Sequence, residues 1–283
     1  MNNILVTGGN GQLGSELKEL ANNFAEYNFL FTDVSDLDIT DHKAVKIFIE
    51  SNNITVIINC AAYTAVDQAE SESDLADSIN HLAVENFAKI AKENNIKLIH
   101  VSTDYVFDGT KFNPYVETDI ANPQSVYGQT KLDGELAIQT INPENSIIIR
   151  TSWVYSKYGN NFVKTMLRLS ETKDKISVVS DQIGSPTSAR DLAKTILTIL
   201  NNIKNQCIEV YHYSNEGDCS WYDFAKAIFE IKGINVKLNP ILTKQYPTPA
   251  KRPFYTVMNT KKIKSKYKIE VPHWRDSLIN FLV

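Results

Sequence analysis

Along its first 150 residues the chain alternates short apolar runs with longer stretches in which apolar and polar residues are mixed. The runs are rich in Ile, Val and Leu at nearly every position, as in parallel strands covered on both faces. They predict strands at 3–7, 29–33, 55–60, 97–102 and 146–150. The mixed stretches predict helices at 12–24, 41–52, 74–95 and 126–140. This alternation favours an α/β fold with a Rossmann-like, doubly wound parallel sheet.

After about residue 150 the alternation becomes less regular. Helices are predicted at 160–171, 188–202 and 220–232, and short strands near 176–180 and 207–213. The proline-containing segment 242–257 predicts an ordered loop. We therefore expect a dinucleotide-binding domain at 1–150 and a smaller, mainly substrate-binding domain at 151–283. Some elements of the second half are expected to pack back on the first domain.

Composition narrows the functional classes. The formal net charge of −4 argues against a nucleic-acid partner, which would require a basic surface. The three cysteines form no CxxC or metal-ligand spacing, which suits a reducing compartment. No basic segment followed by a long apolar one opens the chain, and no apolar run approaches the roughly 20 residues that span a bilayer. A soluble, cytoplasmic protein without a membrane partner is expected.

A glycine-rich segment, "VTGGNGQLGSEL", follows the first predicted strand and opens the first predicted helix. Its GxxGxxG spacing suits a tight turn and a close approach of backbone N–H groups to a pyrophosphate. A glycine-rich turn without a ligand would give the same pattern, but the position between strand and helix favours a dinucleotide site. The residues expected to bind the cofactor here are Gly8, Asn10, Gly11, Gln12, Leu13 and Gly14.

An aspartate, Asp33, ends the second predicted strand about 20 residues after the glycine segment, where a carboxylate accepts hydrogen bonds from ribose hydroxyls. It would repel a 2′-phosphate, and no Lys or Arg lies between Lys18 and Lys43 to attract one. NADH is therefore expected over NADPH. Asp38 and Ile39 are expected to border the adenine, although Asp38 capping a turn would look the same.

Further cofactor contacts are expected where the third and fourth predicted strands end. Small residues in "NCAAYTAVD" would let a dinucleotide lie against the backbone, although a tight strand–helix corner would also need them. The residues expected at these two strand ends are Ala61, Ala62, Tyr63 and Ser102.

Tyr127 and Lys131, in "VYGQTKLDGE", lie four residues apart on a predicted helix. That spacing puts their Cβ atoms roughly 5–6 Å apart. An ammonium beside a phenol is expected to lower the phenol pKa from about 10, as a general acid–base requires. A chance pair on a solvated helix would have the same spacing. Thr103, at the end of the fourth predicted strand, is expected at the same edge of the sheet as the glycine segment.

Together, the glycine segment, Thr103 and the Tyr–Lys pair resemble the extended short-chain dehydrogenase/reductase superfamily. A set of blocks spread over nearly the whole chain resembles more narrowly the dTDP-4-dehydrorhamnose reductase family. These blocks are "AAYTAVDQAES", "STDYVFDG", "VYGQTKLDGE", "RTSWVY", "GNNFVKTMLRL", "DQIGSPTSARDLA", "YPTPAKRP" and the late Trp274.

The resemblance implies an NADH- or NADPH-dependent reduction of the 4-keto group of dTDP-4-dehydro-6-deoxy-L-mannose to dTDP-L-rhamnose, a precursor of cell-surface polysaccharides. It implies that Thr103 and Tyr127 hold the substrate oxygen, that Tyr127 donates a proton and that Lys131 binds the nicotinamide ribose. Further residues implied in substrate binding are Asp104, Tyr105, Trp153, Asn161, Gln182, Thr187 and Arg252.

One position departs from the resemblance. Some members of the family use a glutamate in the segment that here reads "SPTSARDL" for a magnesium-linked dimer interface, and Arg190 stands at that position in this chain. A cation cannot ligate magnesium, and Glu16 alone is a weak ligand set. No metal is expected, and the protein is expected to be a monomer or a homodimer without a bridging metal.

Three other functions are compatible with parts of the pattern. A nucleotide-sugar dehydratase of this superfamily needs Thr-Asp-Glu where this chain has Thr103-Asp104-Tyr105, so dehydration is disfavoured, while epimerisation stays open. A regulatory subunit such as the β subunit of methionine adenosyltransferase would bind dinucleotide without turnover, and the intact Thr103, Tyr127 and Lys131 favour an enzyme over it. An RNA-binding relative fits poorly with the acidic balance.

Overall fold

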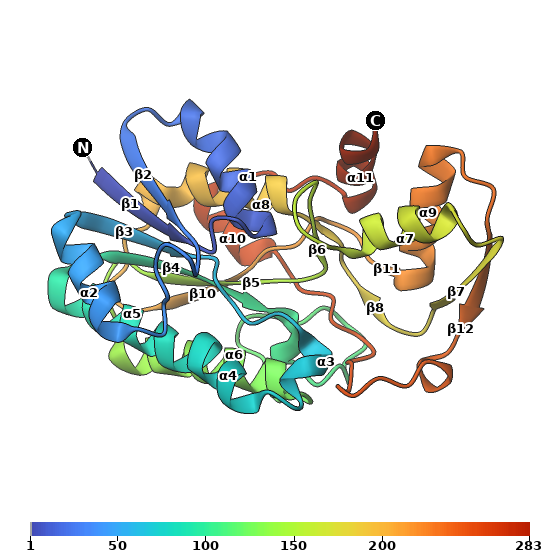
Figure 1. Cartoon of the computed structure of the whole chain (residues 1–283), viewed down its shortest axis with the longest axis horizontal. Coiled ribbons are helices and arrows are strands. Elements are labelled where there is room, and N and C mark those ends of the chain that lie inside the picture. The colour runs from blue at the N-terminus through green and yellow to red at the C-terminus, as the bar shows by residue number, and fades with distance from the viewer. Residues whose placement is uncertain (1) are drawn as a thin grey trace.

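The protein has a large layered part built around a parallel sheet and a smaller part at one end of it (Figure 1). The structure, a computed structural model, describes residues 2–283. Chain segments from both halves of the sequence contribute to the large part, whereas the small part comes from the second half alone.

Six parallel strands form the main sheet, in the order β10-β5-β4-β3-β1-β2. Their bounds are β1 Asn2–Thr7, β2 Tyr27–Thr32, β3 Ile54–Asn59, β4 Lys97–Thr103, β5 Ile147–Thr151 and β10 Glu209–His212. The order reverses beside β1, since β2 lies on one side of it and β3 on the other. The predicted doubly wound sheet is confirmed, and ligands of such sheets bind outside the strand ends at this reversal.

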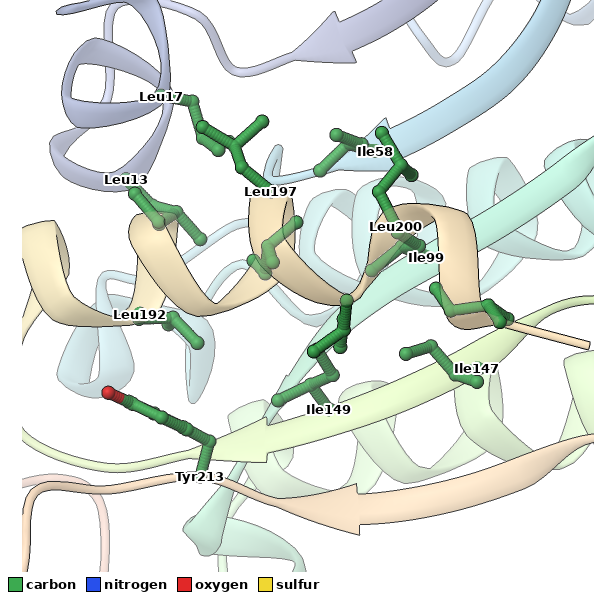
Figure 2. Packing of buried hydrophobic residues seen from close by; sticks show 14 of the residues in the cluster. Leu13, Leu17, Ile58, Ile99, Ile147, Ile149, Leu192, Leu197, Leu200 and Tyr213 are labelled. Atoms are coloured by element: carbon green, nitrogen blue, oxygen red, sulfur yellow. The ribbon is translucent and has the colours of Figure 1, made fainter. Parts of the chain in front are cut away.

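Helices cover both faces of the main sheet. On one face lie α1 (Gln12–Leu20), α8 (Ala189–Ile199) and α10 (Lys261–Tyr267); on the other lie α2 (His42–Ser51), α5 (Ala83–Asn94) and α6 (Val126–Ile141). Figure 2 shows the first face, where Leu192 and Leu197 of α8 lie over Ile149 and its neighbours in the sheet. No helix within residues 2–283 is long and apolar enough to cross a membrane.

The helix predicted at 74–95 is divided in the structure. A short helix, α4 (Ser73–Asp77), is followed by a π-helical turn at Ser78–Leu82 and then by α5. The turn carries Asn80, whose amide accepts from the Tyr63 N–H and donates to the Tyr63 carbonyl and to Thr130. The wider turn lets this one side chain tie the segment after β3 to helix α6. The hydrophobic periodicity of the sequence did not predict this π-helical turn.

The smaller part has its own apolar core, made by aromatic and aliphatic residues of three helices and several short strands. Its helices are α7 (Phe162–Ser170), α9 (Trp221–Lys232) and α11 (Trp274–Leu282). Its strands form three pairs: β7 (Lys175–Val179) with β12 (Lys237–Ile241), β6 (Val154–Tyr155) with β9 (Thr187–Ser188), and β8 (Ile183–Gly184) with β11 (Cys219–Ser220). A further short helix, α3 (Val66–Ala69), lies after β3. The predicted helices near 160, 188 and 220 are confirmed, and so are the strands near 176 and 207.

Candidate active site

A cleft of about 810 Å³ opens at the carboxyl ends of the main-sheet strands and extends to the smaller part. Residues from both halves of the chain line the cleft. The glycine segment and the Tyr–Lys pair lie in this same cavity. The sequence-predicted residues that line the cleft are Gly8, Gly11, Gln12, Leu13, Asp33, Asp38, Ile39, Ala61, Ala62, Ser102, Thr103, Asp104, Tyr105, Tyr127, Lys131 and Trp153.

The glycine segment is a tight turn that brings Gly8 against the backbone just after β3. Gly8 has φ +65°, and a Cβ there would lie 2.8 Å from the Ala61 nitrogen. A Cβ on Gly14 would lie 2.2 Å from the Gly8 carbonyl oxygen, so Gly14 supports the turn from behind and does not line the cleft. Among residues 2–283 no side chain caps the N-terminus of α1, which leaves its first N–H groups available to an anion.

Asp33 lies at the edge of the cleft and shapes the glycine turn. Its Oδ2 accepts from the Asn10 N–H at 2.9 Å, and its Oδ1 accepts from the Val34 N–H at 2.8 Å. Asn10 therefore contributes to the turn through its backbone and does not line the cleft. Asp38 lines the cleft and also accepts from the backbone and hydroxyl of Thr40, so the turn-capping interpretation of Asp38 describes its contacts.

Tyr127 lies in the first turn of α6, which begins after Ser125. The Ser125 hydroxyl accepts from the Gly128 N–H at 3.2 Å and fixes the start of the helix. A Cβ on Gly128 would lie 2.3 Å from the Tyr105 carbonyl oxygen, so only glycine allows this close approach. Burial raises the pKa of Tyr127 to about 12, while a hydrogen bond with Thr103 acts in the opposite direction. The phenol is therefore protonated at neutral pH, as an acid that donates a proton must be.

Lys131 points towards the sheet beneath the cleft and not at solvent. Its Nζ donates to the Val101 carbonyl at 2.7 Å and lies 3.3 Å from His100 Nε2. Burial lowers the pKa of Lys131 to about 8, and the charge of Glu135 partly offsets this effect. The expectation that Lys131 lowers the pKa of Tyr127 is wrong for this arrangement, because burial dominates the phenol and the ammonium is bonded elsewhere.

Thr103 and the two residues after it form one wall of the cleft. The Thr103 hydroxyl donates to Asp104 Oδ1 at 3.1 Å and also accepts from the Tyr105 N–H. Burial raises the pKa of Asp104 to about 6. Burial and the neighbouring Asp104 hold the pKa of Tyr105 above its usual range, and the Tyr105 ring meets that of Tyr127 edge-on at 5.5 Å.

An aromatic pair forms the wall contributed by the smaller part. The rings of Trp153 and Trp221 stack with centroids 3.5 Å apart and an interplanar angle of 8°. Gly184 also packs closely on Trp153, because a Cβ there would lie 2.6 Å from the indole. Trp153 has φ +48°, a costly conformation for a large residue that is often found at binding sites. Trp221 also lines the cleft, and sequence reasoning missed it because no spacing links it to Trp153.

Five sequence-predicted residues contact other parts of the protein and do not line the cleft. They are Tyr63, whose backbone is held by Asn80; Asn161, which caps α7 and donates to Gln12; Gln182, which donates to Thr243; Thr187, buried in β9; and Arg252, which makes two hydrogen bonds to Asp67. Asn160, next to Asn161, lines the cleft instead. The binding role of Tyr63 stays a prediction from its place after the third strand, and those of the other four stay predictions from the resemblance.

Glu16 and Arg190 are in direct contact outside the cleft. Arg190 Nη1 lies 3.3 Å from Glu16 Oε2 and 2.9 Å from Glu19 Oε1, and the Ser156 hydroxyl donates to Glu16 Oε1 at 2.7 Å. Hydrogen bonds from Lys157, Tyr158 and Arg190 lower the pKa of Glu19 to about 2. The guanidinium thus supplies the positive charge beside the buried Glu16 carboxylate.

Comparison with known proteins identifies this constellation. Residues 1–283 match the family model described as the RmlD substrate binding domain. The chain is 45% identical to the dTDP-4-dehydrorhamnose reductase of Aggregatibacter actinomycetemcomitans over 99% of this chain and 98% of that protein. The chain belongs to the dTDP-4-dehydrorhamnose reductase family.

Solved structures of dTDP-4-dehydrorhamnose reductases have the same fold. The crystal structure from Clostridium acetobutylicum is 43% identical, with a TM-score of 0.93 over 99% of this chain and 98% of that one. The enzyme from Bacillus anthracis, solved in complex with NADP, is 40% identical, with a TM-score of 0.94 over 99% of both chains. In this member of the family, the blocks around Thr103, Tyr127 and Trp153 all reach the cleft.

Proposed function

We propose that the protein reduces the 4-keto group of dTDP-4-dehydro-6-deoxy-L-mannose with NADH or NADPH and forms dTDP-L-rhamnose. The observation that carries the proposal is the meeting of Thr103, Tyr127 and Lys131 in one cleft with the glycine turn. Full-length similarity to dTDP-4-dehydrorhamnose reductases supports the choice of sugar.

The cofactor side of the cleft fits a dinucleotide. Gly8 and Gly14 allow the tight turn that brings the backbone to the cleft, and the uncapped start of α1 offers N–H groups to a diphosphate. Asp33 would accept from the adenosine ribose and Lys131 would hold the nicotinamide ribose. When bound, the reduced nicotinamide supplies a hydride to the ketone carbon.

Side chains of the protein donate a proton and hydrogen bonds to the oxygen of the ketone. Tyr127, protonated at neutral pH, donates its phenolic proton to the oxygen as negative charge develops there. The Thr103 hydroxyl proton, which here is donated to Asp104 Oδ1, turns to the substrate oxygen and stabilises the same developing charge by a hydrogen bond. The stacked Trp153 and Trp221 offer an apolar wall for a sugar ring. The buried surroundings exclude water and strengthen these polar interactions.

Dehydration is disfavoured by the residue after Asp104. Tyr105 stands where a dehydratase would have a glutamate base, and burial keeps its pKa above the usual range. A neutral phenol of this kind does not remove a proton from carbon at neutral pH. Epimerisation would need no net consumption of cofactor, so it is distinguished by the assay below.

We propose a functional division that follows the two halves of the chain, with residues 1–150 providing the dinucleotide-binding domain and 151–283 mainly the substrate-binding domain. Trp153 and Trp221 support a substrate role for the second half. Strand β10 and helices α8 and α10 belong to the second half and pack on the main sheet, so the division is not a clean cut in space.

NADH is proposed as the preferred cofactor because of Asp33, although the Bacillus anthracis relative was solved with NADP. In Asp33→Ala, the ratio of the Kd for NADH to that for NADPH should rise about tenfold, as expected for a lost hydrogen bond to a charged group. Fluorescence titration with both cofactors measures the ratio. The control variant is Asp36→Ala, which removes a neighbouring carboxylate that does not line the cleft. In this variant the ratio of the two Kd values should stay unchanged. An unchanged ratio in Asp33→Ala would refute a role in selection.

We also propose that Arg190 replaces a metal ion beside Glu16 and that the protein is a monomer or a dimer without a bridging metal. The contacts of Arg190 with Glu16 and Glu19 support this. Activity and elution volume on size exclusion should both be unchanged after treatment with EDTA. A change in either that magnesium reverses would contradict the proposal.

Cofactor oxidation during turnover tests the proposed function. The protein is mixed with NADH or NADPH and enzymatically made dTDP-4-dehydro-6-deoxy-L-mannose, and the loss of reduced cofactor is followed. Stoichiometric oxidation is expected. Sugar conversion without net oxidation would indicate an epimerase, whereas tight dinucleotide binding without any turnover would indicate a regulatory subunit.

A further inference from the structure

A row of polar side chains lies buried beneath the cleft, across three neighbouring strands. Thr7 of β1, Asn59 of β3 and His100 of β4 are direct register partners and are each at most 1% exposed. The Thr7 hydroxyl donates to Asn59 Oδ1 at 2.6 Å, and Asn59 Nδ2 lies 3.1 Å from His100 Nδ1. Lys131 Nζ, 3.3 Å from His100 Nε2, completes a continuous chain from the glycine turn to the Tyr–Lys helix.

The row follows directly after apolar positions on the same face of the sheet. Leu5, Ile57 and Leu98, two residues earlier on the same three strands, belong to the apolar core under α5 and α6. Burying an amide and an imidazole is costly unless their hydrogen bonds are satisfied, and aliphatic residues would fill the same space more cheaply. What the row provides beyond packing is a second polar partner, besides the Val101 carbonyl, for the Lys131 Nζ.

Only a neutral His100 is compatible with its surroundings. Burial, and then the charge of Lys131, hold the pKa of His100 well below its usual range. A neutral imidazole has one N–H and one acceptor nitrogen. The Nε2 atom therefore either accepts a hydrogen bond from Lys131 or donates one to it. The Nδ1 atom, which faces Asn59, then has the other role: it donates when Nε2 accepts, and it accepts when Nε2 donates.

Two arrangements of protons satisfy the row. With Lys131 as an ammonium, Nε2 accepts from it and Nδ1–H donates to Asn59, which must then present its amide oxygen. With Lys131 as an amine, Nε2–H donates to it and Nδ1 accepts from Asn59 Nδ2, which is the amide orientation seen here. The first arrangement holds one proton more than the second, and that proton leaves to solvent as Lys131 becomes an amine.

The charge of Lys131 is balanced by groups on several elements. Glu135 lies one turn further along α6 and raises the pKa of Lys131, as does Cys60 after β3 more weakly. Glu135 is itself paired with Arg150 of β5. Tyr127 faces the cleft from the preceding turn of α6, and His100 faces Lys131 from β4. Among these groups, His100 is the one in hydrogen-bond contact with Lys131 whose donor and acceptor atoms can exchange.

We propose that His100, held by Asn59 and Thr7, is a positioning residue that fixes Lys131 and changes from acceptor to donor as Lys131 changes charge. The inference rests on the proposed function, in which Lys131 holds the nicotinamide ribose of the cofactor. His100 itself touches neither cofactor nor substrate. It keeps a hydrogen-bond partner on the buried Lys131 Nζ in both protonation states.

The tautomer of His100 is the direct readout and needs no altered residue in the row. Nitrogen NMR spectra of the wild-type protein with NADP⁺ bound would be recorded from pH 6 to 9, the range around the Lys131 pKa of about 8. The His100 signals are assigned by their loss in His100→Gln. The ring proton should lie on Nδ1 at the low end and move to Nε2 at the high end. A proton on the same nitrogen throughout, or on both, would overturn the inference.

Kinetics test whether the contact matters for the reaction. His100→Leu should lower kcat about tenfold, the scale of a lost hydrogen bond to a charged group. The basic limb of its pH–rate profile should move to lower pH, because the buried ammonium loses an acceptor. His100→Gln, which can still accept or donate, should recover most of the rate. Thr32→Val, on β2 opposite Thr7, changes a hydroxyl that has no hydrogen-bond partner among residues 2–283 and should behave as wild type.

The outcomes separate this inference from the function on which it rests. If the wild type does not turn over, the proposed function fails and the inference fails with it. If the wild type turns over and the His100→Leu profile superimposes on it, the inference alone is overturned. If His100→Leu does not fold, the wild-type NMR titration and the pH–rate profile of His100→Gln still test the inference.

Discussion

Replacing Tyr127 by phenylalanine is expected to lower kcat at least about a hundredfold, the scale of a lost general acid. The change removes only the hydroxyl from a ring that is nearly fully buried, so the fold should persist. The Kd for the dinucleotide should change little, because the glycine turn and Asp33 remain. Steady-state kinetics with the keto sugar, together with a thermal melt, measure both effects.

Tyr105→Phe is the matched control for Tyr127→Phe. The two rings touch and both line the cleft, but only Tyr127 has Thr103 beside its hydroxyl. Tyr105→Phe should reduce kcat by no more than about tenfold, since it removes no proton donor for the reaction. Near-wild-type activity in Tyr127→Phe, or an equal loss in both variants, would contradict the assignment of the acid.

Replacing Glu135 by alanine is expected to lower the free energy of unfolding by about 3–5 kcal/mol. Glu135 is fully buried and accepts from Arg150 through Nε and Nη2 at 2.7–3.1 Å. Without it, a buried guanidinium would be left with no counter-charge, over the ring of Phe107. Urea unfolding, with the midpoint and slope compared with wild type, measures the loss.

The control for Glu135→Ala is Glu85→Ala, which removes another helical glutamate from an ion pair. Glu85 pairs with Lys89 at the surface of α5, and such exposed pairs contribute about 0.5 kcal/mol or less. Replacing both partners of the buried pair, in Glu135→Leu with Arg150→Met, should restore most of the stability. A loss in Glu135→Ala no larger than in Glu85→Ala would show that the buried pair contributes little.

The strands of the main sheet were predictable because strands that are buried on both faces are apolar at nearly every position. The helices between them were predictable from their mixed apolar and polar residues. The runs at 55–60 and 97–102 correspond to β3 and β4 within one or two residues. Strand β12 escaped prediction because it is half exposed and contains Pro240, which normally argues against a strand. The π-helical turn at Ser78–Leu82 depends on contacts of Asn80 with distant residues, and no local pattern reports them.

The candidate site was predictable to the extent that it lies at strand ends. Thr103, Tyr127 and the glycine turn reach one cleft because parallel strands deliver their carboxyl ends to the same edge. The direction of a side chain was not predictable: Lys131 turns to Val101 and His100. Trp221 lies in none of the similarity blocks and reaches the cleft through the fold of the smaller part, beside Trp153.

The measurement that tests the central claim most directly follows the transferred hydrogen. The wild-type protein is given dTDP-4-dehydro-6-deoxy-L-mannose with NADH or NADPH carrying deuterium at both C4 positions of the dihydronicotinamide, and the product is examined by NMR and mass spectrometry. We predict dTDP-L-rhamnose with a single deuterium at sugar C4 and one cofactor oxidised for each product formed. A product without deuterium at C4, or no product from a protein that still binds the dinucleotide, would contradict the account.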